Sequence, residues 1–301
     1  MTAIRLVALD LDGTLLAPDG SLSARVERAI REARARGVVV TIATARRWTG
    51  VVPIARQLDL SGPLILYDGA LVRRFPDGAT QLQRALGASL AQRAAETLAR
   101  WEPQVVAQHT TPQGERLIAS EDPPHPKWMG PYLESFSGQA TYAPLDSIAA
   151  ESHETLRLVS FGPIKRLRGA LDALGDMPVG RQILPLGNYG LSELTVFSPD
   201  SSKGAGLRWL ARWLGVSMAE TLAIGDGVND VSMLRAAGLG VAMGNAAPEI
   251  QQAADTVTAA NDVDGVALAI ERYVLDGDAL AADETDDAED IVNDEETEET
   301  A

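Results

Sequence analysis

The chain opens on a buried strand that runs into two aspartates. Ile4 to Leu9 form an almost unbroken apolar run, which is typical of a strand covered on both faces in a parallel sheet. Asp10, Asp12 and Gly13 follow directly. Residues i and i+2 of an extended strand point the same way, so we expect both carboxylates to lie together at the strand's carboxyl end. Close carboxylates repel each other unless a cation or a shared proton relieves them, and the pair therefore favours a divalent metal.

The N-terminal part of the chain alternates between strand and helix patterns. A helix capped by Ser21 or Ser23 and ended by Gly37 follows the opening strand, and then come a β-branched strand at 38–43, a helix near 49–58 and a third strand at 64–67. The same alternation returns after residue 199. This order is the βαβ pattern of a doubly wound, mostly parallel sheet with a Rossmann-like core.

The middle of the chain lacks that regularity. A hairpin, with a strand at 71–75, a turn at 76–78 and a further short extended piece, leads into short strand-like pieces and two helices that continue to about residue 197. This mixture predicts an α+β cap domain inserted into the α/β core. The predicted domains are a discontinuous core at 1–80 and 196–275, a cap at 81–195 and an acidic, disordered tail at 276–301.

Composition excludes several kinds of site. The chain has 301 residues, 46% of them apolar, and no cysteine, which rules out disulfides, thiolate metal ligands and cysteine nucleophiles. Its three histidines are scattered, so a histidine-built zinc site is not expected. No apolar run approaches the ~20 residues of a membrane span, and the start of the sequence lacks a signal-peptide pattern. We therefore expect a cytoplasmic protein without a membrane partner.

The net charge of −16 is concentrated at the C-terminal end. Thirteen Asp or Glu and no Lys or Arg lie between residues 276 and 301, which leaves 29 acidic against 26 basic residues elsewhere. An acidic segment poor in long apolar side chains is typical of disorder and of a solubilising extension. No basic stripe indicates nucleic-acid binding, and nothing in the sequence indicates an oligomeric state.

Polar residues of catalytic type stand at strand ends or at a helix start in four separate stretches. They are Asp10 with Asp12, Thr44, Lys203, and Asp226 with Asn229 and Asp230. The carboxyl ends of parallel strands meet at one edge of a sheet, so these groups are expected in one crevice. There a carboxylate can attack phosphorus, oxygen ligands suit Mg²⁺, and the ammonium and hydroxyl can bind phosphoryl oxygens. A second carboxylic acid can protonate the leaving oxygen and then activate water.

These stretches resemble the four motifs of the haloacid dehalogenase-like hydrolase superfamily. The matching segments are Asp10–Leu15, Thr44–Arg46, Lys203–Gly204 and Gly225–Leu234. Two later segments, Val241–Ala246 and Ala254–Asp255, resemble its Cof-type branch, as does the long insert between the third strand and the lysine. The resemblance covers about residues 4 to 272. It implies a phosphoric monoester hydrolase with a type IIB cap that closes over the crevice and selects the substrate.

The resemblance also implies a role for each acidic residue. Asp10 would be the nucleophile and a Mg²⁺ ligand. Asp12 would be the general acid and base, with its backbone carbonyl on the metal. Asp226 would complete the metal site, and Asp230, in support of it, is grouped with the metal-binding residues.

The phosphoryl group would be held by residues from the other motifs. Thr44 and Lys203 would bind it, and Ala45, Arg46 and Asn229 are grouped with them as phosphate-binding residues. Arg46 can equally form an ion pair with an acidic residue. Two positions depart from the family pattern. Ala45 stands where the family usually has glycine, and Asp68 precedes Gly69 where it often has asparagine; both bear on substrate preference or phosphate binding.

The leading hypothesis is therefore a Mg²⁺-dependent phosphatase. It would act through an aspartyl-phosphate on a small phosphorylated metabolite, such as a sugar phosphate or a nucleotide-type cofactor. One alternative is a phosphosugar mutase that passes the phosphoryl group to a sugar. Another is a degenerate, non-enzymatic phosphate-binding relative, for which the departures at Ala45 and Asp68 leave room. The sequence does not identify the substrate, because specificity would lie in the irregular cap.

Overall fold

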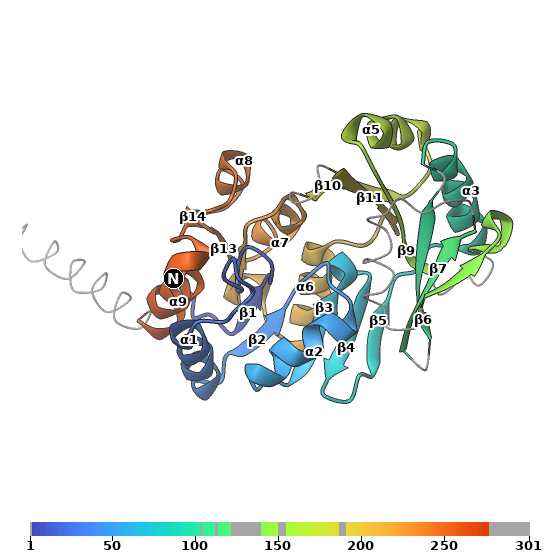
Figure 1. Cartoon of the computed structure of the whole chain (residues 1–301). Coiled ribbons are helices and arrows are strands. Elements are labelled where there is room, and N and C mark those ends of the chain that lie inside the picture. The colour runs from blue at the N-terminus through green and yellow to red at the C-terminus, as the bar shows by residue number, and fades with distance from the viewer. Residues whose placement is uncertain are drawn as a thin grey trace, which may run out of the picture. The chain divides into compact units, whose positions relative to one another are not determined.

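A computed structural model of the chain describes residues 2–102, 104–111, 114–121, 140–149, 155–186 and 191–276. The chain divides into two units, each assembled from separate segments. The first unit holds Met1–Thr44, Ile54–Leu64 and the chain from Lys203 onward; the second holds Ala45–Pro53 and Ile65–Ser202. Figure 1 labels most of the elements of both.

The first unit is built on a five-stranded sheet in which every neighbouring pair is parallel, with the order β14-β13-β12-β1-β2. All residues of β1 and β12 are buried, as their apolar sequences require. Because β2 and β12 lie on opposite sides of β1, the order of the strands reverses there, and open α/β sheets bind ligands at such a reversal. The strands are β1 (Leu6–Leu9), β2 (Val39–Ile42), β12 (Thr221–Gly225), β13 (Leu239–Ala242) and β14 (Thr256–Val257).

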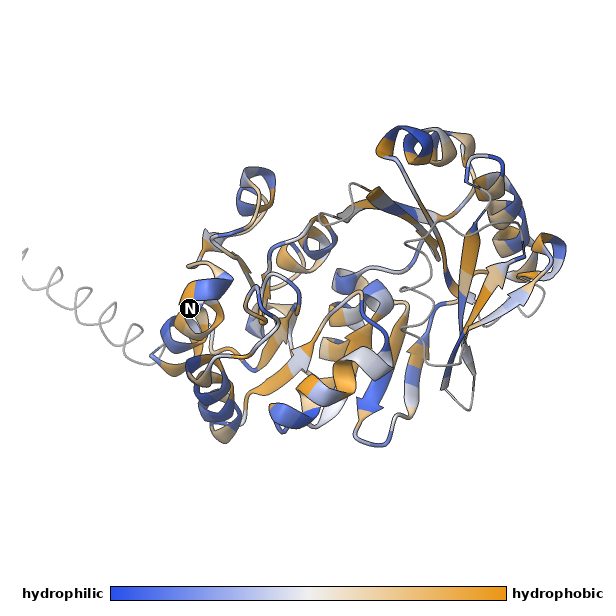
Figure 2. Cartoon of the chain, in the orientation of Figure 1, coloured by the Kyte–Doolittle hydropathy of each residue, from blue (hydrophilic) through white to orange (hydrophobic). Residues whose placement is uncertain are grey.

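Local signals in the sequence set the ends of the first helix. Ser23 accepts a hydrogen bond from the backbone N–H of Val26 at 3.1 Å, and Gly37 ends the helix with φ +82°, so both predicted ends are confirmed. Figure 2 shows apolar strands beside the polar outer surface of this helix. The helices that carry residues of the first unit are α1 (Ala24–Ala35), α2 (Trp48–Gln57, shared with the second unit), α6 (Lys203–Leu214), α7 (Val231–Leu234), α8 (Pro248–Gln251), α9 (Gly265–Ile270) and a π-helical turn at Glu271–Leu275.

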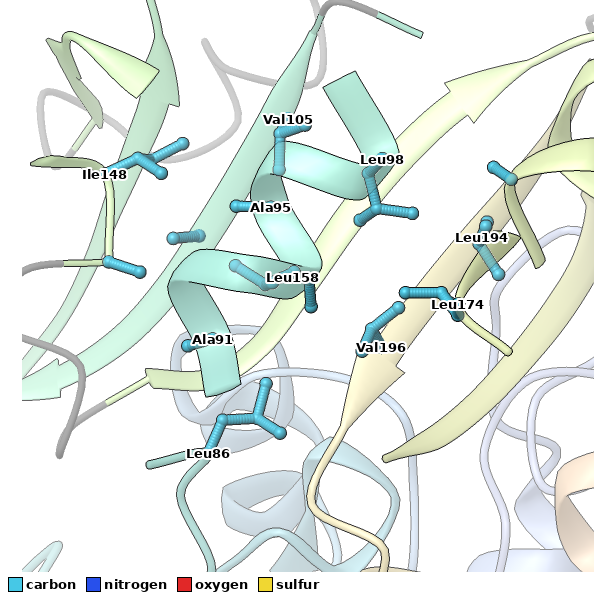
Figure 3. Packing of buried hydrophobic residues seen from close by; sticks show 14 of the residues in the cluster. Leu86, Ala91, Ala95, Leu98, Val105, Ile148, Leu158, Leu174, Leu194 and Val196 are labelled. Carbon is cyan, nitrogen blue, oxygen red and sulfur yellow. The ribbon is translucent and has the colours of Figure 1, made fainter. Parts of the chain in front are cut away.

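The second unit contains a six-stranded sheet with the order β10-β11-β9-β6-β7-β8. Its pairs are antiparallel except β7 with β8. Helices α3 and α5 pack on this sheet, and Figure 3 shows Leu98 of α3 and Leu174 beside α5 among Leu158, Leu194 and Val196 of the strands. The elements are α3 (Ala88–Ala99), β6 (Val105–Thr111), β7 (Gly114–Ser120), β8 (Ala140–Ala143), β9 (Thr155–Gly162), α5 (Ile164–Ala173), β10 (Gly180–Leu186) and β11 (Leu191–Phe197).

One strand lies in a different sheet from the one that the βαβ pattern predicts. β3 (Gly62–Leu66) belongs to a three-stranded sheet with β4 (Leu71–Phe75) and β5 (Thr80–Gln83), not to the parallel sheet. Pro63 has no N–H to donate to a neighbouring strand, and its carbonyl accepts the Thr41 hydroxyl at 2.8 Å. The predicted hairpin is confirmed, because β4 and β5 pair antiparallel.

The fold class is confirmed as α/β with an added sheet module. The two units begin and end at different residues from the predicted domains, since 45–53, 65–80 and 196–202 group with the second unit; the predicted domain boundaries stay a prediction. The acidic tail, apart from Asp276, lies outside the described residues. Across the described ranges, no helix combines the length and the apolar character needed to cross a membrane.

Candidate active site

A buried lysine joins two of the predicted acidic residues. Lys203 begins α6, and its ammonium donates to Asp10 Oδ1 at 2.7 Å and to Asp230 Oδ1 at 2.6 Å. Lys203 and Asp230 have no exposed surface, and Asp10 is 5% exposed. A cation in the first turn opposes the helix dipole, and the two carboxylates compensate for it. In this triad of Lys203, Asp10 and Asp230, the lysine lies 193 positions after Asp10 and 27 positions before Asp230 in the sequence.

Asp230 also shapes the loop that follows β12. Its Oδ2 accepts the backbone N–H groups of Asp226 at 3.0 Å and Gly227 at 2.8 Å. Gly225 lies so close that an added Cβ would stand 2.5 Å from the Cβ of Asp230. Three of the about four acceptor positions of this carboxylate are therefore taken by hydrogen bonds. This arrangement points to Asp230 as a residue that holds Lys203 and the Asp226 loop, and its place among the metal ligands stays a prediction.

The loop after β1 begins with two aspartates of different exposure. β1 ends at Leu9, the Asp10 backbone N–H still donates to the Ile224 carbonyl of β12 at 3.0 Å, and Gly13 turns the chain with φ +80°. Asp10 is buried whereas Asp12 is exposed. The expectation that both carboxylates point together from the strand stays a prediction.

Thr14 is a contact residue that the sequence argument did not single out. Its hydroxyl donates to Asp226 Oδ1 at 2.7 Å. An added Cβ on Gly13 would stand 2.3 Å from Asp226 Oδ2, so this position leaves room only for glycine. The signal was present in the motif itself, where a glycine and a hydroxyl residue follow the second aspartate.

Asp10, Asp226 and Asp230 each place one carboxylate oxygen within 4.8 Å of the others. Burial and the neighbouring Asp230 raise the pKa of Asp10, and Lys203 only partly opposes them. Burial also raises the pKa of Asp226; Thr14 and Lys203 oppose this rise, while Asp230 and Asp12 add to it. One ammonium thus faces three carboxylates, so the cluster has an excess of negative charge that a cation relieves. The donors are all hard oxygens, and the residues present fit Mg²⁺.

Two predicted phosphate-binding residues, Thr44 and Asn229, belong to the first unit. Thr44 is buried two residues beyond the end of β2, the strand that pairs with β1. Asn229 lies in the turn at Val228–Asp230, directly before Asp230. Their roles stay predictions.

The remaining predicted residues fall in the second unit. Ala45 and Arg46 open that unit, and their phosphate-binding roles stay predictions. Asp68 is buried in a turn at Tyr67–Gly69, with φ +52°. Asn and Asp adopt this left-handed conformation more readily than most residues, so Asp68 keeps the backbone shape of the asparagine that it replaces.

The sequence matches the model of the haloacid dehalogenase-like hydrolase family over residues 7–270. A relative from Serratia proteamaculans, HMP-PP phosphatase, is 31% identical over 82% of this chain and 86% of its own length. The Bacillus subtilis 5-amino-6-(5-phospho-D-ribitylamino)uracil phosphatase YcsE is 29% identical over 90% of this chain and 96% of its own. A solved structure of a haloalkanoate (HAD) superfamily phosphatase from Bacteroides thetaiotaomicron superposes with a TM-score of 0.75 at 25% identity, covering 90% of this chain and 95% of that one.

Proposed function

Because the chain belongs to the haloacid dehalogenase-like hydrolase family, as a phosphatase of its Cof-type branch, we propose that it uses Mg²⁺ to hydrolyse a small phosphorylated metabolite, such as a sugar phosphate, through an aspartyl-phosphate. The buried cluster of Asp10, Asp226, Asp230 and Lys203 is the observation that carries this proposal. The two relatives described above are named as phosphatases, one of them of a phosphorylated ribitylaminouracil, and they support this substrate class. A cytoplasmic location is part of the proposal.

The residues divide the reaction into two displacements. Asp10 attacks phosphorus and forms a P–O bond, while the bond from phosphorus to the leaving oxygen breaks and Asp12 donates a proton to that oxygen. Asp12, now a carboxylate, takes a proton from water as the water oxygen attacks phosphorus, which releases phosphate and restores Asp10. Asp12 is exposed, as proton exchange with water requires.

The other residues bind and orient. Lys203 and Thr44 hold phosphoryl oxygens, on which charge accumulates as the bonds change. Asp10 and Asp226, with Asp230 in support, would hold Mg²⁺. The ion, when bound, supplies positive charge that offsets the carboxylates against the incoming phosphate.

The test is phosphate release from an aryl phosphate in the presence of Mg²⁺. We expect Asp10→Asn to abolish release, because the amide is not a nucleophile toward phosphorus. Asp59→Asn is the matched control, since the Asp59 side chain is 97% exposed and Asp59 belongs to none of the motifs. An unchanged rate in Asp10→Asn would show that the nucleophile is misassigned. Transfer of a labelled phosphoryl group to a sugar, without release to water, would indicate the mutase alternative.

A further inference from the structure

We propose that Asn245 and Asn261 are positioning residues that clamp the loop at residues 10–16 by donating to two of its carbonyl groups. The proposal rests on the phosphatase activity proposed above. It concerns the segments that follow β13 and β14, the two strands that lie beyond β12 from β1, and these segments carry none of the catalytic residues assigned so far.

The clamp consists of three hydrogen bonds within the first unit. Asn245 Nδ2 donates to the Gly13 carbonyl at 2.8 Å, and Asn261 Nδ2 donates to the Leu16 carbonyl at 2.7 Å. The backbone N–H of Asn261 donates to Asn245 Oδ1 at 3.0 Å. The two side chains are therefore linked to each other, and they grip the loop at two carbonyls three residues apart.

Only a carboxamide satisfies these contacts at position 245. The side chain has to donate to Gly13 through one atom and accept from Asn261 through the other, and an aspartate lacks the donor while keeping the same shape. Turning the amide over would set its oxygen against the Gly13 carbonyl, so the network fixes its orientation. The turn that carries Asn245 is held separately by Gln251, whose Nε2 donates to the carbonyls of Gly244 at 3.1 Å and Ala246 at 3.0 Å.

The clamp sets where the loop lies relative to Asp226. In the sheet, β12 lies between β1 and β13, so the loop after β1 leans across the end of β12 to reach Asn245. Its Gly13 α-carbon packs against the Asp226 carboxylate, and Thr14 donates to that carboxylate at 2.7 Å. Asp226 and Asn245 thus hold Gly13 from two strand ends, and Asp12 directly precedes it.

Positioning of this kind affects turnover more than binding. Asn245 is exposed, so its hydrogen bonds exchange readily with water and add little to stability. A displacement of ~1 Å at a reacting group, however, lowers a rate by about 100-fold. Loss of the clamp would let Asp12 drift from the geometry that protonates the leaving oxygen.

The experiment compares Asn245→Ala, Asn245→Asp and Gln251→Ala in the full chain with an aryl phosphate and Mg²⁺. We expect both Asn245 variants to lower kcat by at least about tenfold with KM within about twofold, the pattern of an interaction needed in the transition state. Gln251→Ala is expected to keep kcat within about twofold. The double variant Asn245→Ala/Asn261→Ala is expected to have a kcat only slightly below that of Asn245→Ala, because linked groups act as one unit.

Hydrogen exchange gives a second readout that does not depend on activity. Backbone amides in the 10–16 segment are expected to exchange at least about tenfold faster in Asn245→Ala than in wild type or Gln251→Ala, because the loop opens more often. Unchanged exchange would overturn the clamp, whether or not the chain is active. Equal kcat losses in Gln251→Ala and Asn245→Ala would also overturn it, since any loosening of the turn would then suffice.

The kinetic outcomes separate the two proposals. An active wild type, an inactive Asp10→Asn and an unimpaired Asn245→Ala would refute the clamp and leave the phosphatase proposal standing. A wild type without phosphatase activity would refute the proposed function and, with it, the catalytic role of the clamp.

Discussion

Replacing Lys203 by methionine tests the buried charge cluster most directly. The substitution keeps an unbranched side chain of similar length and removes the ammonium that pairs with Asp10 and Asp230 at 2.7 and 2.6 Å. Two carboxylates would then face each other without a cation in a place where Lys203 and Asp230 have no exposed surface. Removing one partner of a buried ion pair costs about 3–5 kcal/mol, because the other charge stays buried and uncompensated.

The assay is urea unfolding without Mg²⁺, so that no metal masks the loss. We expect Lys203→Met to lower the free energy of unfolding by about 3–5 kcal/mol, whereas the matched Lys165→Met, at an exposed lysine of α5, should change it by at most about 0.5 kcal/mol. The double variant Lys203→Met/Asp230→Asn should lose less free energy of unfolding than the two single variants lose together, and the difference should be about 0.5–3 kcal/mol. Two results would contradict a triad of Lys203, Asp10 and Asp230 that is shielded from water. One is a fall in the free energy of unfolding of less than about 1 kcal/mol in Lys203→Met, and the other is a double variant whose loss equals the sum of the two single losses.

Three further substitutions test contacts elsewhere. Gly13→Ala forces a Cβ to within 2.3 Å of Asp226 Oδ2 at φ +80°, so it should lower stability by more than about 1 kcal/mol and abolish phosphate release; wild-type behaviour in both assays would contradict the packing. Glu115 accepts the Trp48 backbone N–H at 2.6 Å at the start of α2, so Glu115→Ala should lower the free energy of unfolding in urea by about 0.5–2 kcal/mol, and Glu115→Gln, which keeps an acceptor, by less. Leu194→Ala empties part of the fully buried core in Figure 3 and should cost about 2–5 kcal/mol in the same assay; a loss under 1 kcal/mol would mean that this core collapses around the gap.

Residues with strong local signals were predictable from the sequence. The apolar run before Asp10, the cap at Ser23 and the left-handed Gly37 act through their immediate neighbours, and the structure has each as expected. The proximity of Asp10 and Asp226 also followed, because the carboxyl ends of the parallel strands β1 and β12 meet at one edge of the sheet. Lys203 begins a helix, and its place beside them was expected from the motif resemblance.

Other features depend on contacts between residues that are far apart in the sequence. The shape of the loop after β1 depends on the turn at Gly13, which packs against Asp226 more than 200 residues later. β3 groups with β4 and β5 rather than with the parallel sheet, although its sequence looked as regular as that of the parallel strands. β8 was missed because its four residues carry only a short, partly exposed pattern.

The pairing of β1 with β12 has a consequence for how the chain is made. β1 pairs with β2, which follows within about 40 residues, but its other edge pairs with β12 at Thr221–Gly225. At about 5–20 residues per second, a ribosome takes roughly 10–40 s to synthesise the chain between β2 and β12. For that time one edge of a wholly apolar strand has no partner from its own sheet, and such edges recruit other chains. Chains released before β12 is made should therefore aggregate, and the edge of the sheet that carries Asp10 and Asp226 can form only after β12 has been synthesised.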